Sequence, residues 1–165
     1  MLRQYLYSMI EIINVHKYSG GLEKAARYIH SKWGCEENFP FYLDAIKHSF
    51  DSKASIPKFF LLMKNDKPIG CYGLIMNDFI SRHDLFPWFC SLFIEPEERG
   101  HEYGKLLLEH AIEETAKLGF DHLYLTTNHD GYYEKYGFKR IEDGIDLEGK
   151  PTRIYEKLCC KGQNS

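Results

Sequence analysis

An apolar run, a polar turn and an amphipathic segment follow one another between Trp88 and Leu118, and this stretch constrains the fold more than any other. The run from Trp88 to Ile94 reads WFCSLFI, which is typical of a strand buried on both faces inside a sheet. From Gly104 to Leu118, small and apolar residues recur three and four positions apart, which predicts a helix with one buried face. Gly119 favours the left-handed conformation that ends a helix.

The junction between this strand and this helix has the features of an anion-binding site. The first backbone N–H groups of a helix have no partners within it, and the helix dipole adds partial positive charge at the same end. Gly100 and Gly104 remove side chains where a phosphate must approach the backbone. Arg99 and Lys105 supply full charges. The glycines alone fit an ordinary strand-to-helix connection equally well.

Two later segments favour the anion site. A strand-like segment spans His122–Thr127, and the segment Tyr133–Phe138 reads YEKYGF. Together with the turn RGHEYG that starts at Arg99, they resemble the GNAT superfamily of acetyl-CoA-dependent N-acetyltransferases. That family joins an apolar strand, an Arg-x-x-Gly-x-Gly/Ala turn and helix, a second strand and a Tyr-Glu-Lys-x-Gly-Phe helix. This chain departs from the pattern at Glu102, in place of the middle glycine, so this carboxylate must point to solvent if the loop binds through backbone N–H groups.

The resemblance implies an α/β fold: a mixed, mostly antiparallel sheet with a splayed parallel strand pair at its centre and helices on both faces. It also implies acetyl-CoA as co-substrate, with its pantetheine arm paired to the central strand like an extra strand. Carried over residue by residue, the expected acetyl-CoA contacts are Leu92, Phe93, Ile94, Arg99, Gly100, His101, Glu102, Tyr103, Gly104, Lys105, Asn128 and Tyr133.

Acetyl transfer from a thioester to an amine requires adjacent reactants, an uncharged amine and a proton for the departing thiolate. The resemblance implies that Tyr133 supplies this proton, because it matches the family tyrosine near the thioester sulfur. An alkyl amine with a pKa of about 10 is mostly protonated at neutral pH, so a base or a water relay is needed. Asp84 is the first candidate base, and His83 and Asp78 are the others. The polar connection that carries all three also fits a solvated link with Asp/Arg pairs.

Three further expectations concern side chains near this site. Glu95 is expected to face solvent, and Asp130 to cap the turn that carries Tyr133. The resemblance places the acceptor beside the helical segments at 22–30 and 40–50. The aromatic residues there are nevertheless expected to pack in the core: Trp33, Phe39, Phe41 and Tyr42.

The remaining strands are expected at 9–15, 59–63, 68–76, 139–146 and 152–158. Gly70 and Gly73 interrupt one of them, which indicates a bulge or the close approach of a neighbour. The 165 residues suit a single acetyltransferase domain over 1–165, with a frayed tail at 159–165.

A net charge of −3 excludes nucleic acid and anionic membrane as the expected partners. No signal peptide and no membrane-spanning stretch are predicted. The five cysteines lack framework spacing and indicate free thiols in a reducing cytoplasm. Cys90 is interpreted as a buried thiol, Cys159 and Cys160 as an incidental tail, and no metal site is predicted.

The sequence therefore predicts an N-acetyltransferase that moves an acetyl group directly from acetyl-CoA to a primary amine. A small-molecule acceptor is favoured, while polyamine, aminoglycoside, amino acid and protein N-terminus remain open. The alternative is a non-catalytic acyl-CoA-binding module in which the Glu102 loop keeps the ligand but turnover is lost. The oligomeric state is open and compatible with a homodimer.

Overall fold

The computed structural model describes residues 9–50 and 56–159. Their strands form one seven-stranded sheet in the order β1-β2-β3-β4-β5-β7-β6. The strands are β1 Ile10–Asn14, β2 Lys58–Lys64, β3 Lys67–Ile75, β4 Trp88–Ile94, β5 His122–Thr126, β6 Lys139–Ile145 and β7 Pro151–Leu158. The α-helices are α1 Leu22–Trp33, α2 Phe39–Lys47 and α3 Tyr103–Lys117. The 3₁₀ helices are η1 Val15–Lys17, η2 Glu36–Asn38, η3 His48–Phe50, η4 Pro96–Glu98 and η5 Tyr133–Tyr136.

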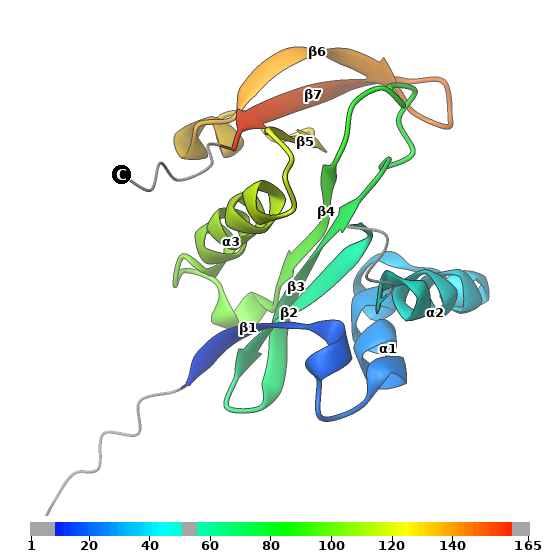
Figure 1. The fold of residues 1–165 in the computed structure, drawn as a ribbon, viewed down its shortest axis with the longest axis vertical. Helices are drawn as coiled ribbons and strands as arrows, with labels where there is room; N and C mark the ends of the chain where they lie inside the picture. The colour runs from blue at the N-terminus through cyan, green and yellow to red at the C-terminus, as the bar shows by residue number, and fades with distance from the viewer. Residues whose placement is uncertain (1–8, 51–55, 160–165) are drawn as a thin grey trace, which may run out of the picture.

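The strand pairs are antiparallel except for β4 and β5, which run parallel at the centre of the sheet. Helices α1 and α2 cover one face, and α3 covers the other (Figure 1). Two buried clusters follow this division. One packs Leu107, Leu108 and Ala111 of α3 against the sheet, and the other packs Ala25 and Ile29 of α1. The mixed α/β fold with helices on both faces is confirmed.

Helix α3 forms where the apolar spacing predicts it, and it buries one face completely. Leu107, Leu108, Ala111 and Thr115 have no exposed surface. The Thr115 hydroxyl is satisfied inside the core because it donates to the Ala111 carbonyl oxygen at 2.7 Å. The helix ends at Lys117, two residues before the positive φ of Gly119, as expected.

The two glycines of β3 lie against β4, where the chains approach closely. A Cβ atom at Gly70 would lie 2.8 Å from the Phe93 carbonyl oxygen, and one at Gly73 would lie 3.0 Å from Cys90 Sγ. The β3–β4 register shifts between Cys71 and Gly73. On the β4 side Ser91 has φ +56, so the extra residue bends the strand there. Both expected reasons for the glycines, a bulge and a close neighbour, are confirmed.

The C-terminal hairpin forms within one residue of the predicted bounds, and its end is anchored. Strand β7 lies between β5 and β6, and Cys159 after it is only 2% exposed. The Cys159 backbone N–H donates to the Asp121 carbonyl oxygen at 2.7 Å. The predicted fraying is therefore wrong at Cys159, because this residue joins the core. Cys160 and the rest of the predicted tail, 160–165, lie outside the described residues.

Candidate active site

The parallel strands β4 and β5 meet at one end and separate at the other. Their register contains one pair, Trp88 with Tyr124, within the part of the chain that the structure describes. The Tyr124 N–H donates to the Pro87 carbonyl oxygen at 3.0 Å, and beyond this point the strands diverge. The splayed pair expected at the centre of the sheet is therefore present.

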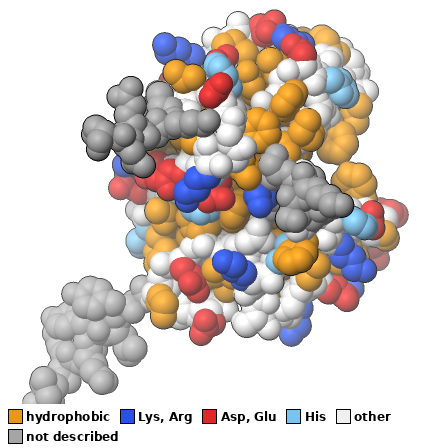
Figure 2. All heavy atoms as spheres, viewed as in Figure 1, with side chains coloured by type: hydrophobic (Ala, Val, Ile, Leu, Met, Phe, Trp, Pro, Cys, Tyr) orange, Lys and Arg blue, Asp and Glu red, His pale blue; other side chains and the backbone are white. Residues whose placement is uncertain are grey.

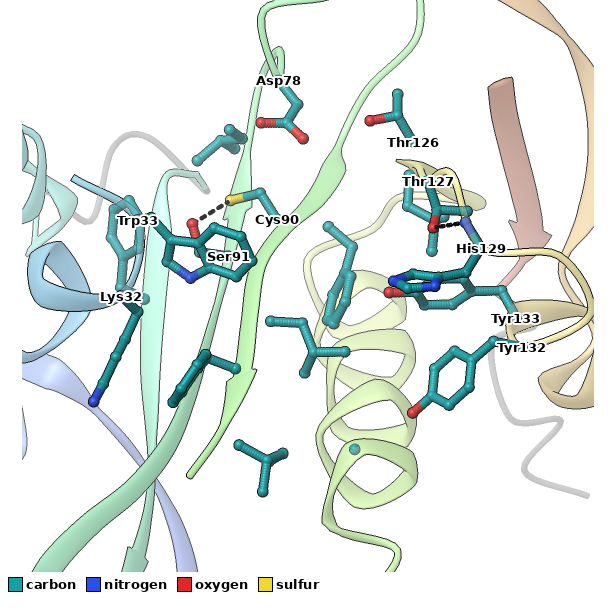
Figure 3. A pocket seen from close by; sticks show the side chains of 18 of the residues that line it. Lys32, Trp33, Asp78, Cys90, Ser91, Thr126, Thr127, His129, Tyr132 and Tyr133 are labelled. Atoms are coloured by element: carbon teal, nitrogen blue, oxygen red, sulfur yellow. Dashed lines mark hydrogen bonds between the residues drawn. The ribbon is translucent and has the colours of Figure 1, made fainter. Parts of the chain in front are cut away.

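A cavity of about 1650 Å³ lies in and around this gap. Pockets for one small ligand are usually about 300–1,000 Å³, so this cavity has room for two reactants. Figure 3 shows side chains from both walls converging on it, and Figure 2 shows hydrophobic side chains exposed on either side of the hollow. The walls from these two strands consist of residues 89–94 of β4, and of Leu125 and Thr126 of β5 with Thr127 and Asn128 after it.

The loop before α3 forms one end of the cavity. Together with the first turn of α3 it spans residues 99–105, and six of these seven residues line the cavity, the exception being His101. Gly100 has φ +84 and an ideal Cβ there meets nothing within 4 Å, so the backbone is open to a ligand. Arg99 and Lys105 bring two cations, and the N-terminal turn of α3 brings its free N–H groups. These features fit the diphosphate of a coenzyme A ester.

Glu102 occupies a backbone conformation that favours glycine. Its φ of +59 and ψ of 23 are left-handed, which costs an L-residue about 1 kcal/mol. The side chain is exposed. A glycine at this place would adopt the same backbone without strain, and Glu102 instead leaves a carboxylate beside the first N–H groups of α3.

Tyr133 and Tyr132 both reach the cavity from η5 and the residue before it. Tyr133 is 9% exposed, and burial raises its pKa to about 12, so the phenol keeps its proton at neutral pH. The two rings meet edge to face at 4.9 Å. The Tyr132 hydroxyl lies 2.6 Å from the position that a Cβ of Gly104 would take, so it sits over the start of α3. Tyr132 and Tyr136 were expected only to pack this turn, but both also line the cavity.

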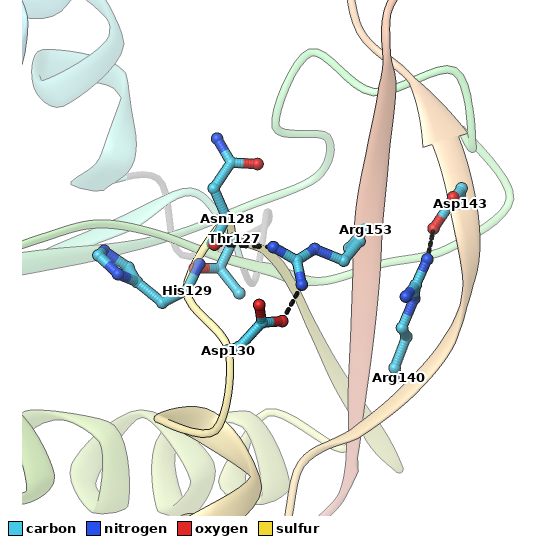
Figure 4. Close-up of polar contacts among 7 residues, drawn as sticks. All are labelled: Thr127, Asn128, His129, Asp130, Arg140, Asp143 and Arg153. Carbon is cyan, nitrogen blue, oxygen red and sulfur yellow. Dashed lines mark hydrogen bonds and ion pairs between the residues drawn. The ribbon is translucent and has the colours of Figure 1, made fainter.

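Asp130 does not cap η5, because the structure shows no side-chain cap there. Its carboxylate pairs with the guanidinium of Arg153 on β7 (Figure 4). Arg153 Nη2 also donates to the Asn128 carbonyl oxygen at 2.7 Å. The expected cap is therefore wrong, and the neighbouring strand holds the loop that leads from β5 to Tyr133.

Asp84 and His83 lie outside the cavity. Asp84 accepts hydrogen bonds from Arg82 Nε at 2.8 Å and Nη2 at 2.6 Å, and Arg82 also pairs with Glu142 of β6. The hydrogen bond from Arg82 holds the pKa of Asp84 below its usual value, which makes this carboxylate a weak base. The alternative interpretation of this connection, a solvated link with Asp/Arg pairs, is therefore correct for Asp84.

Asp78, the third candidate base, lines the cavity instead. Burial raises its pKa from 3.8 to about 6, a value suited to a general base at neutral pH. Figure 3 shows its carboxylate beside Cys90 at the opposite end of the cavity from α3. Cys90 is buried and accepts a hydrogen bond from Ser91 Oγ at 3.7 Å. Burial raises the pKa of the Cys90 thiol, so it stays protonated.

The sequence predicted that Glu95 faces solvent, and this prediction is wrong. Its side chain is 17% exposed and pairs with Lys32 Nζ at 2.5 Å. The Tyr28 hydroxyl donates to the same carboxylate at 2.8 Å. Helix α1 is thereby tied to the end of β4, a contact between distant segments that sequence periodicity does not reveal.

The four aromatic residues assigned to the core divide into two pairs. Phe39 and Tyr42 are partly buried and pack against the α1–α2 cluster as expected, although Tyr42 also lines the cavity. Trp33 and Phe41 are 52% and 60% exposed and line the cavity, so their assignment to the core is wrong. Their helices expose these positions toward the gap in the sheet, which the helical spacing alone did not show.

Cys35, Cys71 and Cys90 are free thiols. No group of His, Cys, Asp and Glu within 9–50 and 56–159 could hold a metal ion. None of the helices in these ranges is long and apolar enough to cross a membrane.

A splayed parallel pair, a glycine-bearing loop before a helix and a tyrosine in the gap define the architecture of an acetyltransferase. The family model for the acetyltransferase (GNAT) domain matches residues 55–140, which is more than half of the chain. The chain belongs to the GNAT acetyltransferase family, as its motifs indicated.

Relatives and solved structures agree with this assignment. The chain is 30% identical over 96 residues to peptidyl-lysine N-acetyltransferase YjaB of Salmonella typhimurium strain LT2, and the match covers 58% of this chain and 59% of that protein. A GNAT acetyltransferase from Staphylococcus aureus Mu50 superposes with a TM-score of 0.66 at 21% identity, covering 92% of this chain and 100% of the other.

A GNAT acetyltransferase from Elizabethkingia anophelis with acetyl-CoA bound superposes with a TM-score of 0.62 at 16% identity, covering 90% of this chain and 97% of the other. An aminoglycoside 6'-N-acetyltransferase complexed with coenzyme A superposes with a TM-score of 0.67 at 15% identity, covering 93% of this chain and 99% of the other. At these identities the likeness shows a common fold.

Proposed function

We propose that this protein transfers an acetyl group from acetyl-CoA directly to a primary amine. The observation that carries the proposal is one cavity that runs from the loop before α3, past Tyr133, to the carboxylate of Asp78. Each requirement of the reaction then has a group in the same space: an anion site, a proton donor and a base.

The first requirement is placement of the thioester. Arg99, Lys105 and the N–H groups of α3 would hold the diphosphate, and Gly100 lets it approach the backbone. Leu92, Phe93 and Ile94 lie where β4 has left β5, so their backbone can pair with the extended pantetheine arm. Asn128, on the other wall, completes this proposed binding path.

The second requirement is removal of a proton from the amine. The amine nitrogen attacks the thioester carbonyl carbon, and its N–H becomes acidic as the new N–C bond forms. We assign Asp78 as the acceptor of that proton, directly or through one water, because it lines the cavity and its pKa is raised to about 6. We do not assign this role to Asp84, because its exposed carboxylate is paired with Arg82 outside the cavity.

The third requirement is a proton for the leaving group. The C–S bond breaks, and Tyr133 donates its phenolic hydrogen to the departing thiolate. A phenol with a pKa of about 12 is a weaker acid than a thiol with one of about 8.5. The transfer must therefore be coupled to the return of the amine proton from Asp78 to the phenolate through solvent. The products are the N-acetylated amine and free coenzyme A, with both catalytic groups restored.

Release of free coenzyme A thiol from acetyl-CoA on addition of amines tests the proposal, with the acetylated product identified by mass spectrometry. Transfer supports an enzyme. Tight acetyl-CoA binding by calorimetry, without thiol release by any amine, would instead support the non-catalytic acyl-CoA-binding module.

A further inference from the structure

Phe79 occupies a strained backbone conformation at the mouth of the cavity. Its φ is +58, a left-handed value that is rare for a bulky residue, and its side chain is 54% exposed. Asn77 holds the turn on both sides, because its side chain donates to the Ile80 carbonyl oxygen at 2.8 Å and accepts from the Ile80 N–H at 3.0 Å. Strain maintained in this way is characteristic of functional sites.

The strained turn brings the Phe79 ring toward a second exposed aromatic residue. The ring centroids of Phe79 and Phe41 lie 6.3 Å apart, although the two residues come from different elements. Trp33 of α1 is a third exposed aromatic residue that lines the same cavity. We refer to Trp33, Phe41 and Phe79 as the aromatic wall. Exposing three large rings to water is unfavourable unless a ligand covers them.

The carboxylates that line the cavity limit how many positive charges an acceptor can carry. Among the described cavity-lining residues, the carboxylates are Asp78, Glu102 and Asp130. Glu102 belongs to the loop before α3, and Asp130 is paired with Arg153. Asp78 is therefore the one of these three carboxylates that could bind an amine held by the aromatic wall. The nearby cation, Lys32, is paired with Glu95. Within the described residues Asp78 forms no ion pair, and it directly precedes Phe79 in the chain, so the cavity offers one unpaired carboxylate next to this ring.

We propose that the acceptor is a primary arylalkylamine, with its ring against the aromatic wall and its ammonium or amine nitrogen at Asp78. This inference rests on the proposed acetyl transfer and specifies its substrate class. One carboxylate matches one amino group, whereas a polycationic polyamine or aminoglycoside would place its further charges against apolar rings. Desolvating a cation without a partner is unfavourable. The balanced reaction is arylalkylamine plus acetyl-CoA to N-acetyl arylalkylamine plus coenzyme A.

The test compares kcat/KM for 2-phenylethylamine with that for putrescine and for a lysine-containing peptide, at saturating acetyl-CoA. We expect 2-phenylethylamine to be preferred by at least about tenfold. Phe79→Gly removes the ring and relieves the left-handed strain. It should lower kcat/KM for 2-phenylethylamine about tenfold, by raising KM, while acetyl-CoA affinity and thermal stability do not fall.

A matched control is Phe50→Ala, because Phe50 is 74% exposed but does not line the cavity. This variant should keep the parent preference. Calorimetry of 2-phenylethylamine binding to the protein loaded with coenzyme A gives a second readout that does not need turnover. There too, Phe79→Gly should weaken binding and Phe50→Ala should not.

The possible results separate the two proposals. Acetyl transfer with putrescine or the peptide preferred overturns the arylalkylamine inference and leaves acetyl transfer standing. Binding of 2-phenylethylamine that depends on Phe79, without acetylation of any amine, overturns acetyl transfer and supports the amine site. A change of oligomeric state in Phe79→Gly, with unchanged amine affinity, assigns the ring to an interface and overturns the inference.

Discussion

Trp88 and Tyr124 are the paired residues at which the parallel strands β4 and β5 meet, with ring centroids 5.8 Å apart. The Tyr124 N–H donates to the Pro87 carbonyl oxygen at 3.0 Å, so the two segments are joined at this end of the gap. From there the strands diverge and leave the backbone of β4 available. The position of this one pair therefore decides where the proposed thioester site lies.

Tyr133→Phe should lower kcat about 10²–10⁴-fold, because it removes the proposed proton donor and keeps the buried ring. Acetyl-CoA affinity and thermal stability should change little. Tyr132→Phe is the comparison. Its hydroxyl lies at Gly104, so its loss should affect the KM for acetyl-CoA rather than kcat. Steady-state kinetics distinguish the two variants. Parent-like turnover in Tyr133→Phe would mean that the thiolate leaves unassisted or takes its proton from water.

Asp78→Asn should remove the limb of the pH–rate profile near pH 6, where the Asp78 carboxyl loses its proton and becomes a base. Below that pH the parent is slow because the base is protonated. Asp84→Asn is the matched control, and it should keep the parent profile because Asp84 is exposed and paired with Arg82. If Asp84→Asn abolished this limb and Asp78→Asn did not, Asp84 would be the base.

The same variant should be more stable than the parent at neutral pH. The folded-state pKa of Asp78 is raised from 3.8 to about 6, so ionisation above pH 6 opposes folding, while below about pH 4 both states bind the proton. The free energy of unfolding gained by Asp78→Asn should thus be small at pH 4 and approach about 3 kcal/mol at pH 8. Urea unfolding at the two pH values measures it. An equal gain at both would assign the effect to packing.

Gly104→Glu should abolish acetyl-CoA binding, because it places bulk and negative charge at the N-terminus of α3. Gly104→Ala separates the two causes: its methyl group must displace the Tyr132 hydroxyl but adds no charge. Leu106→Glu adds the charge at an exposed position outside the cavity and should bind normally. Calorimetry with acetyl-CoA reports all three affinities. Unchanged affinity in folded Gly104→Glu would place the phosphates elsewhere.

Glu102→Gly should both stabilise the fold and tighten acetyl-CoA binding. Glycine accepts the left-handed backbone at this position, for a net gain of up to about 1 kcal/mol. Removal of the carboxylate also reduces repulsion of the diphosphate. Glu102→Ala removes the charge and keeps the strained Cβ, so it should improve affinity without the gain in stability. Equal affinities in the parent and both variants would show that the carboxylate does not act on the ligand.

The order of the elements and the family were determined by the sequence alone. Helix α3 and strand β4 follow from the local spacing of apolar residues, and the Arg99–Gly104 and Tyr133–Phe138 motifs lie where that spacing predicts a turn and a helix start. These features depend on neighbours along the chain, so periodicity predicts them to within a few residues.

Side-chain roles between distant segments were decided by the tertiary structure. Asp84 is drawn to Arg82, whose second partner, Glu142, lies on another strand, whereas Asp78 reaches the cavity. Trp33 and Phe41 face the gap between β4 and β5 instead of the core. No local pattern could assign these directions, because they depend on the strained turn at Phe79 and on how the sheet opens beyond Trp88 and Tyr124. The direction of each side chain in the acceptor region is set by contacts that form only when the strands pair.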